Sequence, residues 1–258
     1  IDSSSGPDVY LSYRAQPDGM LAALTAHHLS ARTLGRSGER LRVYAALDEA
    51  VASCKAIGGD AKGYIGNITD ESAVEATFAQ IKADFGQING LVNNAGIMRD
   101  GMLIKVKDGE LQGKMSLQQF QSVLDVNVTG TFLCGREAAG IMAAQGTGGV
   151  IVNISSVSRA GNIGQTNYSA SKAAVATMVS SWAGELARHK IRVGGIAPGV
   201  IGTDIIADMK PEAIDRMISA VPLRRLGKVE EMAHTLQYII ENDFFTGRIV
   251  EMDGGLRV

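Results

Sequence analysis

Short apolar runs alternate with longer helical patterns from residue 48 to the end of the chain. The runs typical of buried strands are 61–68, 88–96, 149–155, 191–199 and 248–255. The stretches with helical periodicity are 48–59, 70–86, 116–145, 167–189, 211–219 and 228–242. This alternation predicts an α/β fold, with one doubly wound parallel sheet and helices on both of its faces. No linker-like segment interrupts the pattern, so we expect a single domain over residues 1–258.

Polar and glycine-rich clusters follow three of the predicted strands, at Asn93–Gly96, Ser155–Ser156 and Pro198–Thr203. In open parallel sheets, ligands bind outside the carboxyl ends of the strands. We therefore expect these clusters to meet at one edge of the sheet and to form the functional site there.

Tyr168 and Lys172 are four residues apart at the start of a predicted helix, a spacing that places both on one face. A phenol has an ordinary pKa near 10 and is a poor base at neutral pH. An ammonium about 4 Å away would favour the phenolate by on the order of 4 kcal/mol at an effective dielectric of 20. The pair therefore predicts acid–base chemistry with a lowered tyrosine pKa, although an isolated pair of this kind is more often an ordinary helix surface.

Two further polar positions strengthen this interpretation. Ser155 and Ser156 end a strand at the same edge, where a hydroxyl could hold a carbonyl oxygen, although such a pair is more often a turn or an N-cap. Asn127 lies within a predicted helix, where its side chain competes with the backbone. It is either exposed or opens the helix locally to bind water.

Six segments, taken in order, resemble the short-chain dehydrogenase/reductase family. They are NNAG (93–96), Asn127, ISS (154–156), YSASK (168–172), APGVIGT (197–203) and VPLRRLG (221–227). Within that family, residues 47–258 are most similar to 3-oxoacyl-thioester reductases of the fatty-acid-synthesis type. The resemblance implies a Rossmann-like fold and an NAD(P)-dependent oxidoreductase that interconverts a carbonyl and a secondary alcohol. The implied substrate is a small molecule or an acyl thioester of coenzyme A or of an acyl carrier protein.

The resemblance also implies roles for single residues. Tyr168 would give or take the proton, Lys172 would lower its pKa and bind the nicotinamide ribose, and Asn127 would hold a relay water. The implied cofactor-binding residues are Asn67, Ile68, Asn94, Ala95, Gly96, Tyr168, Lys172, Pro198, Gly199, Ile201 and Thr203. The serine that polarises the carbonyl is Ser155 by its spacing from Tyr168, and Ser156 by the strand pattern VNISS. We favour Ser156, because a strand register varies less than a loop length.

The first 47 residues depart from the family. Segments 8–14 and 41–47 could be strands and 20–29 a helix, but the family's TGxxxGxG turn is absent, and only Gly19 stands in its place. The departure has three possible explanations: a divergent N-terminus, a wrongly recorded segment, or the loss of cofactor binding.

This segment also carries our expectation for the cofactor. Ala45 and Ala46 stand where an acidic residue would bind a ribose hydroxyl, and Arg40 and Arg42 lie close by. We therefore expect NADP or NAD, with a modest preference for NADPH.

Composition and charge restrict the other functions. A net charge of −2 gives no reason to expect nucleic acid or a membrane as a partner, and no apolar run is long enough to span a bilayer. Cys54 and Cys134 lack metal-ligand spacing, so we expect no metal, reduced thiols and a cytoplasmic protein. The helices over 116–145 and 167–189 are apolar over more than one stripe, which predicts burial against symmetry-related subunits, and the family resemblance implies that the assembly is a homotetramer.

Two positions bear on the substrate. Leu133 and Gly184 match the two arginines that dock the carrier protein in relatives, which favours coenzyme A or free substrates. Four other arginines could substitute: Arg136, Arg188, Arg224 and Arg225. Two alternatives remain open, namely another alcohol, sugar or steroid dehydrogenase of the family and a cofactor-free scaffold subunit.

Overall fold

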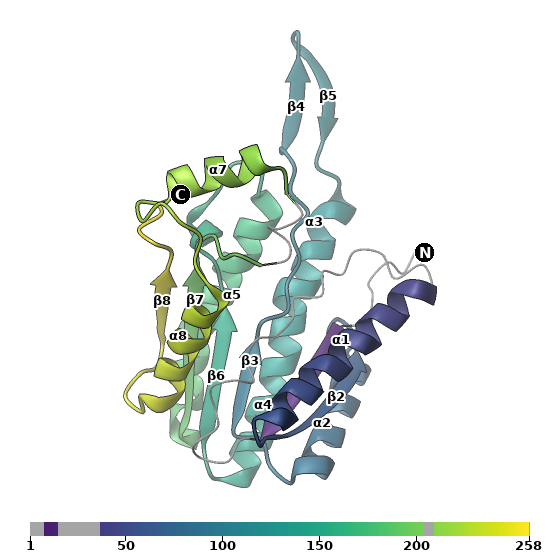
Figure 1. Ribbon diagram of the computed structural model, residues 1–258, viewed down its shortest axis with the longest axis vertical. Coiled ribbons are helices and arrows are strands. Elements are labelled where there is room, and N and C mark those ends of the chain that lie inside the picture. Colours follow the sequence, from purple (N-terminus) through teal and green to yellow (C-terminus); the bar gives the residue numbers. More distant parts are fainter. Residues whose placement is uncertain (1–7, 15–36, 204–208, 258) are drawn as a thin grey trace.

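The computed structural model describes residues 8–14, 37–203 and 209–257. Its centre is a parallel sheet in the order β3-β6-β7-β8, formed by β3 (Gly90–Asn93), β6 (Gly149–Ile154), β7 (Ile191–Pro198) and β8 (Arg248–Met252). All four strands fall within runs that the apolar pattern predicts as strands. Their carboxyl ends point toward the same end of the molecule (Figure 1).

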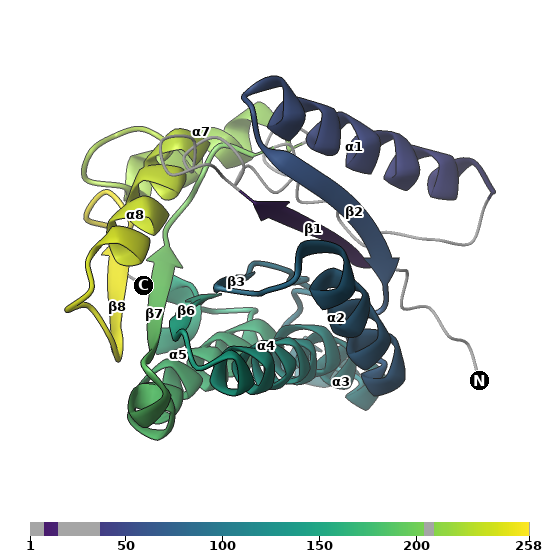
Figure 2. The same ribbon diagram turned by 90° about the horizontal axis from the view of Figure 1, so that it is seen from below.

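Helices cover both faces of this sheet. On one face lie α2 (Glu71–Phe85), α4 (Thr131–Gln145) and α5 (Thr166–Leu186), and on the other lies α8 (Val229–Glu241) (Figure 2). Strand β6 explains why: Ile151 packs in the core of the first face, whereas its neighbours Val150 and Val152 pack against α8. A strand that buries both sets of alternating side chains needs cover on both sides. The predicted α/β fold class is confirmed.

The N-terminal part of the chain differs from expectation. Strand β1 (Asp8–Arg14), predicted as a strand, pairs antiparallel with β2 (Asp60–Gly66), and the two form a separate two-stranded sheet. The strand predicted over 41–47 is wrong, because these residues belong to helix α1 (Ser37–Ala56). Alanine, leucine, arginine and glutamate make up much of the run from Glu39 to Ala56, which has no glycine or proline, so local propensity favours one helix.

Two of the sequence expectations lie outside the described residues. These are the helix over 20–29 and the candidate phosphate turn with Gly19. The assignment of one domain to residues 1–258 therefore stays a prediction.

A projecting β-hairpin is the main element that the apolar pattern missed. It consists of β4 (Ile104–Lys107) and β5 (Glu110–Lys114), and it extends beyond the body of the protein at the end where the parallel strands finish (Figure 1). Asp108 and Gly109 form its turn with φ values of 53° and 79°. An Asp-Gly pair is a strong signal for such a two-residue turn, so the sequence did contain the information.

The remaining elements complete the carboxyl-end region. They are helix α3 (Leu117–Leu124), a π-helical turn (Asp125–Gly130), two 3₁₀ turns (Val157–Ala160 and Ala187–His189) and helix α7 (Pro211–Ala220). The long helix predicted over 116–145 is therefore present, but the π-helical turn divides it between α3 and α4. Ser116 caps its start by accepting a hydrogen bond from the Gln119 amide.

Candidate active site

The polar clusters predicted to meet do follow neighbouring strands of the parallel sheet. Asn94–Gly96 come after β3, Ser155 and Ser156 after β6, and Gly199 after β7. The amide of Gly199 donates to the carbonyl of Met252 at the end of β8, over 2.9 Å. These segments therefore form one edge of the sheet, with the first turns of α5 beside it.

Asn127 lies in the π-helical turn and is 1% exposed. Its Oδ1 accepts from the amide of Ile97 at 2.8 Å, and its Nδ2 donates to the Ile97 carbonyl at 3.0 Å and to Ser171 Oγ at 2.9 Å. The sequence left two possibilities for Asn127, namely an exposed side chain or a local opening of the helix. The structure shows the second, because the side chain is buried and the helix widens to a π-turn. Such π-turns are frequent at functional sites. Here the side chain fixes the segment after β3 against α5.

Tyr168 and Lys172 lie on the first turns of α5, as their spacing predicts. Lys172 is 5% exposed, and its Nζ donates to the carbonyl of Ile154, the last residue of β6, at 2.8 Å. The same nitrogen lies 5.7 Å from the centre of the Tyr168 ring. The side chain of Ser156 is hydrogen-bonded to the phenol. The structure therefore brings Ser156, Tyr168 and Lys172 together at the sheet edge.

The two serines have different surroundings. Ser155 is 2% exposed, and its Oγ donates to the backbone carbonyl of Lys172 at 2.8 Å, which ties α5 to β6. Ser156 Oγ accepts from the Ser158 amide at 3.1 Å and also reaches the phenol of Tyr168. The hydroxyl of Ser155 is thus committed to the scaffold, whereas that of Ser156 faces the tyrosine. This difference favours Ser156 as the serine of the site.

The electrostatics correct one expectation. Burial raises the pKa of Tyr168 above its ordinary value, the hydrogen bond from Ser156 lowers it in part, and the charge of Asp100 raises it further. Burial also lowers the pKa of Lys172 to about 8, which weakens the positive charge that was expected to favour the phenolate. The expected lowering of the tyrosine pKa is therefore wrong for this structure. At neutral pH the phenol keeps its proton and can donate it.

A glycine makes room for a ligand beside these groups. A Cβ atom at Gly96 would lie 3.3 Å from both Asn127 Oδ1 and Lys172 Nζ, which is tighter than most real Cβ contacts. Lys172 has three N–H donors, and the Ile154 carbonyl is its one acceptor among the described residues. The residues present thus fit the ribose of a nicotinamide cofactor, because two donors and an open backbone face the same space.

The other residues predicted to bind the cofactor differ in their burial and in their hydrogen bonds. Ile68 is 3% exposed and packs beneath Gly130 in the core, so it could reach a ligand only through its backbone. Asn67 Oδ1 accepts from the amide and hydroxyl of Thr69. Ile201 pairs with Gly227 after β7, and Thr203 is the last residue described before the segment 204–208.

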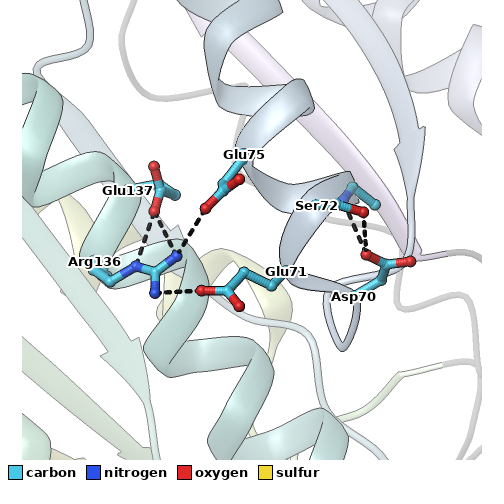
Figure 3. A network of polar contacts seen from close by, with 7 residues as sticks. Asp70, Glu71, Ser72, Glu75, Arg136 and Glu137 are labelled. Atoms are coloured by element: carbon cyan, nitrogen blue, oxygen red, sulfur yellow. Dashed lines mark hydrogen bonds and ion pairs between the residues drawn. The ribbon is translucent and has the colours of Figure 1, made fainter.

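Helix α4 carries a charged network that bears on the substrate. Arg136 binds Glu71 at 2.6 Å, Glu75 at 3.4 Å and Glu137 at 2.9 Å, and thereby joins α4 to the first turns of α2 (Figure 3). Asp70 caps the same end of α2. The charge of Arg136 is therefore largely compensated within the chain.

Of the other positions considered for a carrier protein, Arg225 is also paired with a carboxylate. Arg225 is bound by Glu231 at 2.6 Å, and Leu133 is 5% exposed within the core. Gly184 is exposed, and a Cβ atom there would contact nothing. These surroundings leave little free positive charge at Arg136 and Arg225.

Some residues of this region were not found from the sequence. Asp100 acts on the tyrosine through its charge, and Asn167 is a fully buried neighbour of Tyr168. No spacing rule distinguishes an asparagine that is buried in a first helical turn from one that is exposed there.

Comparisons with known proteins agree with this site. A family model described as Enoyl-(Acyl carrier protein) reductase matches residues 29–257. The 3-oxoacyl-[acyl-carrier-protein] reductase of Thermotoga maritima is 37% identical over 213 residues, which are 81% of this chain and 82% of the relative. The human 3-oxoacyl-[acyl-carrier-protein] reductase is 37% identical over 230 residues (88% and 92%), and Carbonyl reductase family member 4 of Xenopus laevis is 37% identical over 194 residues (74% and 76%).

The chain belongs to the short-chain dehydrogenase/reductase family. It is an NAD(P)-dependent oxidoreductase, as the resemblance implied. Among the described residues, no helix has the length and apolar character that a membrane span requires.

Proposed function

We propose that this protein reduces a 3-oxoacyl thioester to the 3-hydroxyacyl thioester, with NAD(P)H as the hydride donor. The observation that carries the proposal is the protonated phenol of Tyr168, held between Ser156 and Lys172 at the carboxyl edge of the sheet. A proton donor at this place suits reduction of a carbonyl. The names of the relatives supply the substrate class.

The proposed chemistry uses the side chains as follows. Lys172 and the backbone at Gly96 would hold the nicotinamide ribose, and the cofactor, when bound, would supply the hydride that reduces the carbonyl carbon. Ser156 donates a hydrogen bond to the carbonyl oxygen, and Tyr168 gives its proton to that oxygen as negative charge develops there. Lys172 binds the ribose hydroxyls with the two donors that the Ile154 carbonyl leaves free.

Asn127 has a different part in this proposal. Both of its Nδ2 hydrogens are used by the Ile97 carbonyl and Ser171, and its Oδ1 already accepts from the Ile97 amide. Its backbone carbonyl, in the π-helical turn, accepts from the Thr131 hydroxyl at 2.8 Å and has a second lone pair. We assign the relay water to that carbonyl, from which a proton can return toward Lys172 and Tyr168.

Coenzyme A is the carrier that we propose for the acyl group. Two of the arginines that could bind an acidic carrier protein, Arg136 and Arg225, already bind glutamates. Acetoacetyl-coenzyme A should therefore be reduced with a kcat/KM at least equal to that of the same acyl group on a carrier protein. A tenfold advantage for the carrier-bound substrate would overturn the choice of coenzyme A.

The test of the function is NADPH oxidation with acetoacetyl-coenzyme A, with Tyr168→Phe as the key variant. Phenylalanine keeps the packing of the ring but lacks the hydroxyl that donates the proton. We therefore expect kcat to fall by about 10² to 10⁴, while NADPH still raises the melting temperature. Near-normal turnover in this variant would remove Tyr168 from the mechanism. The absence of a thermal shift with either NADH or NADPH would favour the scaffold alternative.

We also propose a modest preference for NADPH over NADH. The proposal comes from the sequence, in which segment 41–47 contains no acidic residue and Arg40 and Arg42 lie close by. The segment is helical rather than the end of a strand, so the fold adds no support. The ratio of kcat/KM for the two cofactors tests the preference, and a tenfold advantage for NADH would reverse it.

A homotetramer in the cytoplasm completes the proposal. Phe132 is 43% exposed on α4, and Gly140 on α4 and Gly184 on α5 have no neighbour within 4 Å of a Cβ position. Helices with exposed aromatic and small residues suit close helix–helix contact between subunits. Light scattering that gives one active species of 27.2 kDa would refute the assembly.

A further inference from the structure

The projecting hairpin joins the rest of the protein through two short segments, Arg99–Gly101 before β4 and Ser116–Gln119 after β5. We call these segments the hairpin root. Within the root, Gln119 Nε2 donates to the carbonyls of Arg99 at 2.9 Å and Asp100 at 3.3 Å. The two sides of the root are therefore bonded to each other. The root also reaches the loop before α5, where the amide of Gly101 donates to the carbonyl of Gly164 at 2.7 Å.

Asn167 connects this root to the catalytic helix. Its Nδ2 donates to the Arg99 carbonyl at 2.8 Å and to the Gln119 carbonyl at 3.3 Å, so one amide group binds both sides of the root. Its Oδ1 accepts from the backbone amide of Tyr168 at 2.9 Å. The side chain is fully buried. Each of its polar atoms is thus used, and one of them holds the residue that carries the proposed proton.

The backbone position of Tyr168 explains why this contact matters. Tyr168 is in the first turn of α5, where backbone amides have no partner within the helix. The N-cap residue Gln165 makes no side-chain cap, and its Nε2 instead donates to Asp100 Oδ2 in the root at 2.9 Å. The first turn of α5 is therefore held from outside, by the root and through Asn167.

We propose that Asn167 is a positioning residue, which fixes Tyr168 relative to Ser156 and Lys172 by fastening the first turn of α5 to the hairpin root. The proposal rests on the proposed function of Tyr168. A tyrosine displaced by about 1 Å can lose on the order of 10²-fold in rate, because proton transfer needs hydrogen-bond geometry. Looser packing of the root would also expose the phenol and remove part of the burial that raises its pKa.

The test is Asn167→Asp, which keeps the side-chain shape and the acceptor for the Tyr168 amide. It replaces the Nδ2 donor with an oxygen that faces two carbonyls, so both bonds to the root are lost. We expect kcat to fall tenfold to a hundredfold, with the NADPH dissociation constant unchanged within twofold. The new carboxylate itself raises the pKa of Tyr168, as the charge of Asp100 does, so the kcat–pH profile is compared in the uncharged variant described next. Asn89→Asp is the matched control, because Asn89 is exposed just before β3, at the end of the sheet opposite the hairpin root.

A second variant protects the test against poor folding of Asn167→Asp. Gln119 is half-buried, and Gln119→Met removes the two bonds across the root without adding a charge. It should lower kcat by about threefold and, because it adds no charge, shift the alkaline limb of the kcat–pH profile to lower pH. Gln121→Met, on the same helix and bonded to Asp125, is its control and should leave both unchanged.

The outcomes separate two failures. If Asn167→Asp or Gln119→Met lowers only the melting temperature, with kcat per bound cofactor and the pH profile unchanged, the positioning role is refuted. If Tyr168→Phe remains active, the proposed function of Tyr168 fails instead. If Tyr168→Phe is inactive and Asn167→Asp has the kcat of the wild type, the positioning role alone is overturned.

Discussion

Lys172→Met should make the cofactor-free protein more stable at neutral pH while it abolishes turnover. Lys172 is 5% exposed, and burial lowers its pKa from 10.5 to about 8. Each pKa unit corresponds to 1.36 kcal/mol, so holding the charged amine in the fold costs about 3 kcal/mol. Methionine keeps most of the chain length and removes the charge. It also leaves the Ile154 carbonyl without its donor, which costs about 1–3 kcal/mol.

The pH dependence of the free energy of unfolding separates the effect of the buried charge from the effect of the lost hydrogen bond. The native protein binds the Lys172 proton more weakly than the unfolded chain, so the penalty is fully present below pH about 8 and disappears as pH rises through the unfolded value of 10.5. The lost hydrogen bond contributes equally at both ends of this range. Between pH 7 and pH 10, the stability of the wild type should therefore rise by about 2–3 kcal/mol relative to Lys172→Met.

Urea unfolding of both proteins at pH 7 and pH 10, at one protomer concentration, measures this difference. Lys105→Met on the exposed hairpin is the control, because the same substitution in water removes no buried charge. A difference between wild type and Lys172→Met that stays constant within about 1 kcal/mol over this range would refute the reasoning from burial.

Three further predictions follow from the same contacts. Ser156→Ala should lower kcat by about 10- to 10³-fold, whereas Ser155→Ala should mainly cost about 1 kcal/mol of stability in urea unfolding, and the reverse pattern would make Ser155 the serine of the site. Gly96→Ala should weaken NADPH binding in calorimetry with little change in melting temperature, and unchanged binding would place the ribose elsewhere. The bond from Arg225 lowers the pKa of Glu231 to about 2, so its stabilisation is present above the unfolded pKa of about 4.3 and is lost as pH falls toward 2. Glu231→Gln should therefore flatten acid unfolding over that interval, and an unchanged acid transition would contradict this origin.

Periodicity and turn residues were sufficient for most of the fold. The central strands β6 and β7 are short, buried on both faces and contain several β-branched residues, so their signal does not depend on distant contacts. The error at 41–47 has the opposite cause, because LRVYAAL also suits a helix and nothing in the run ends one. The hairpin turn at Asp108–Gly109 was visible in the sequence, but its strands are short and exposed, and only β4 (IKVK) alternates apolar and polar residues.

The site was predictable to the level of which residues gather, and not to the level of their protonation. The four-residue spacing was sufficient to predict that Tyr168 and Lys172 lie on one helical face. The direction of the tyrosine pKa depends on how deeply both groups are buried and on the Asp100 charge, which is distant in sequence. The roles of Ser155 and Ser156 depend on which way each hydroxyl points. Such information arises only when α5 packs against β6.

The buried polar groups of the site share one structural property. Asn127, Lys172 and Asn167 each bond a backbone group just beyond or at the carboxyl end of a strand: Ile97 after β3, Ile154 at the end of β6 and Arg99 in the hairpin root. Strand pairing stops there, and buried backbone groups still need partners. The same side chains therefore complete the fold and form the site, so that truncation to alanine disturbs both. Isosteric changes such as Asn167→Asp and Lys172→Met separate the two effects, because they alter donors and charge while the volume stays nearly constant.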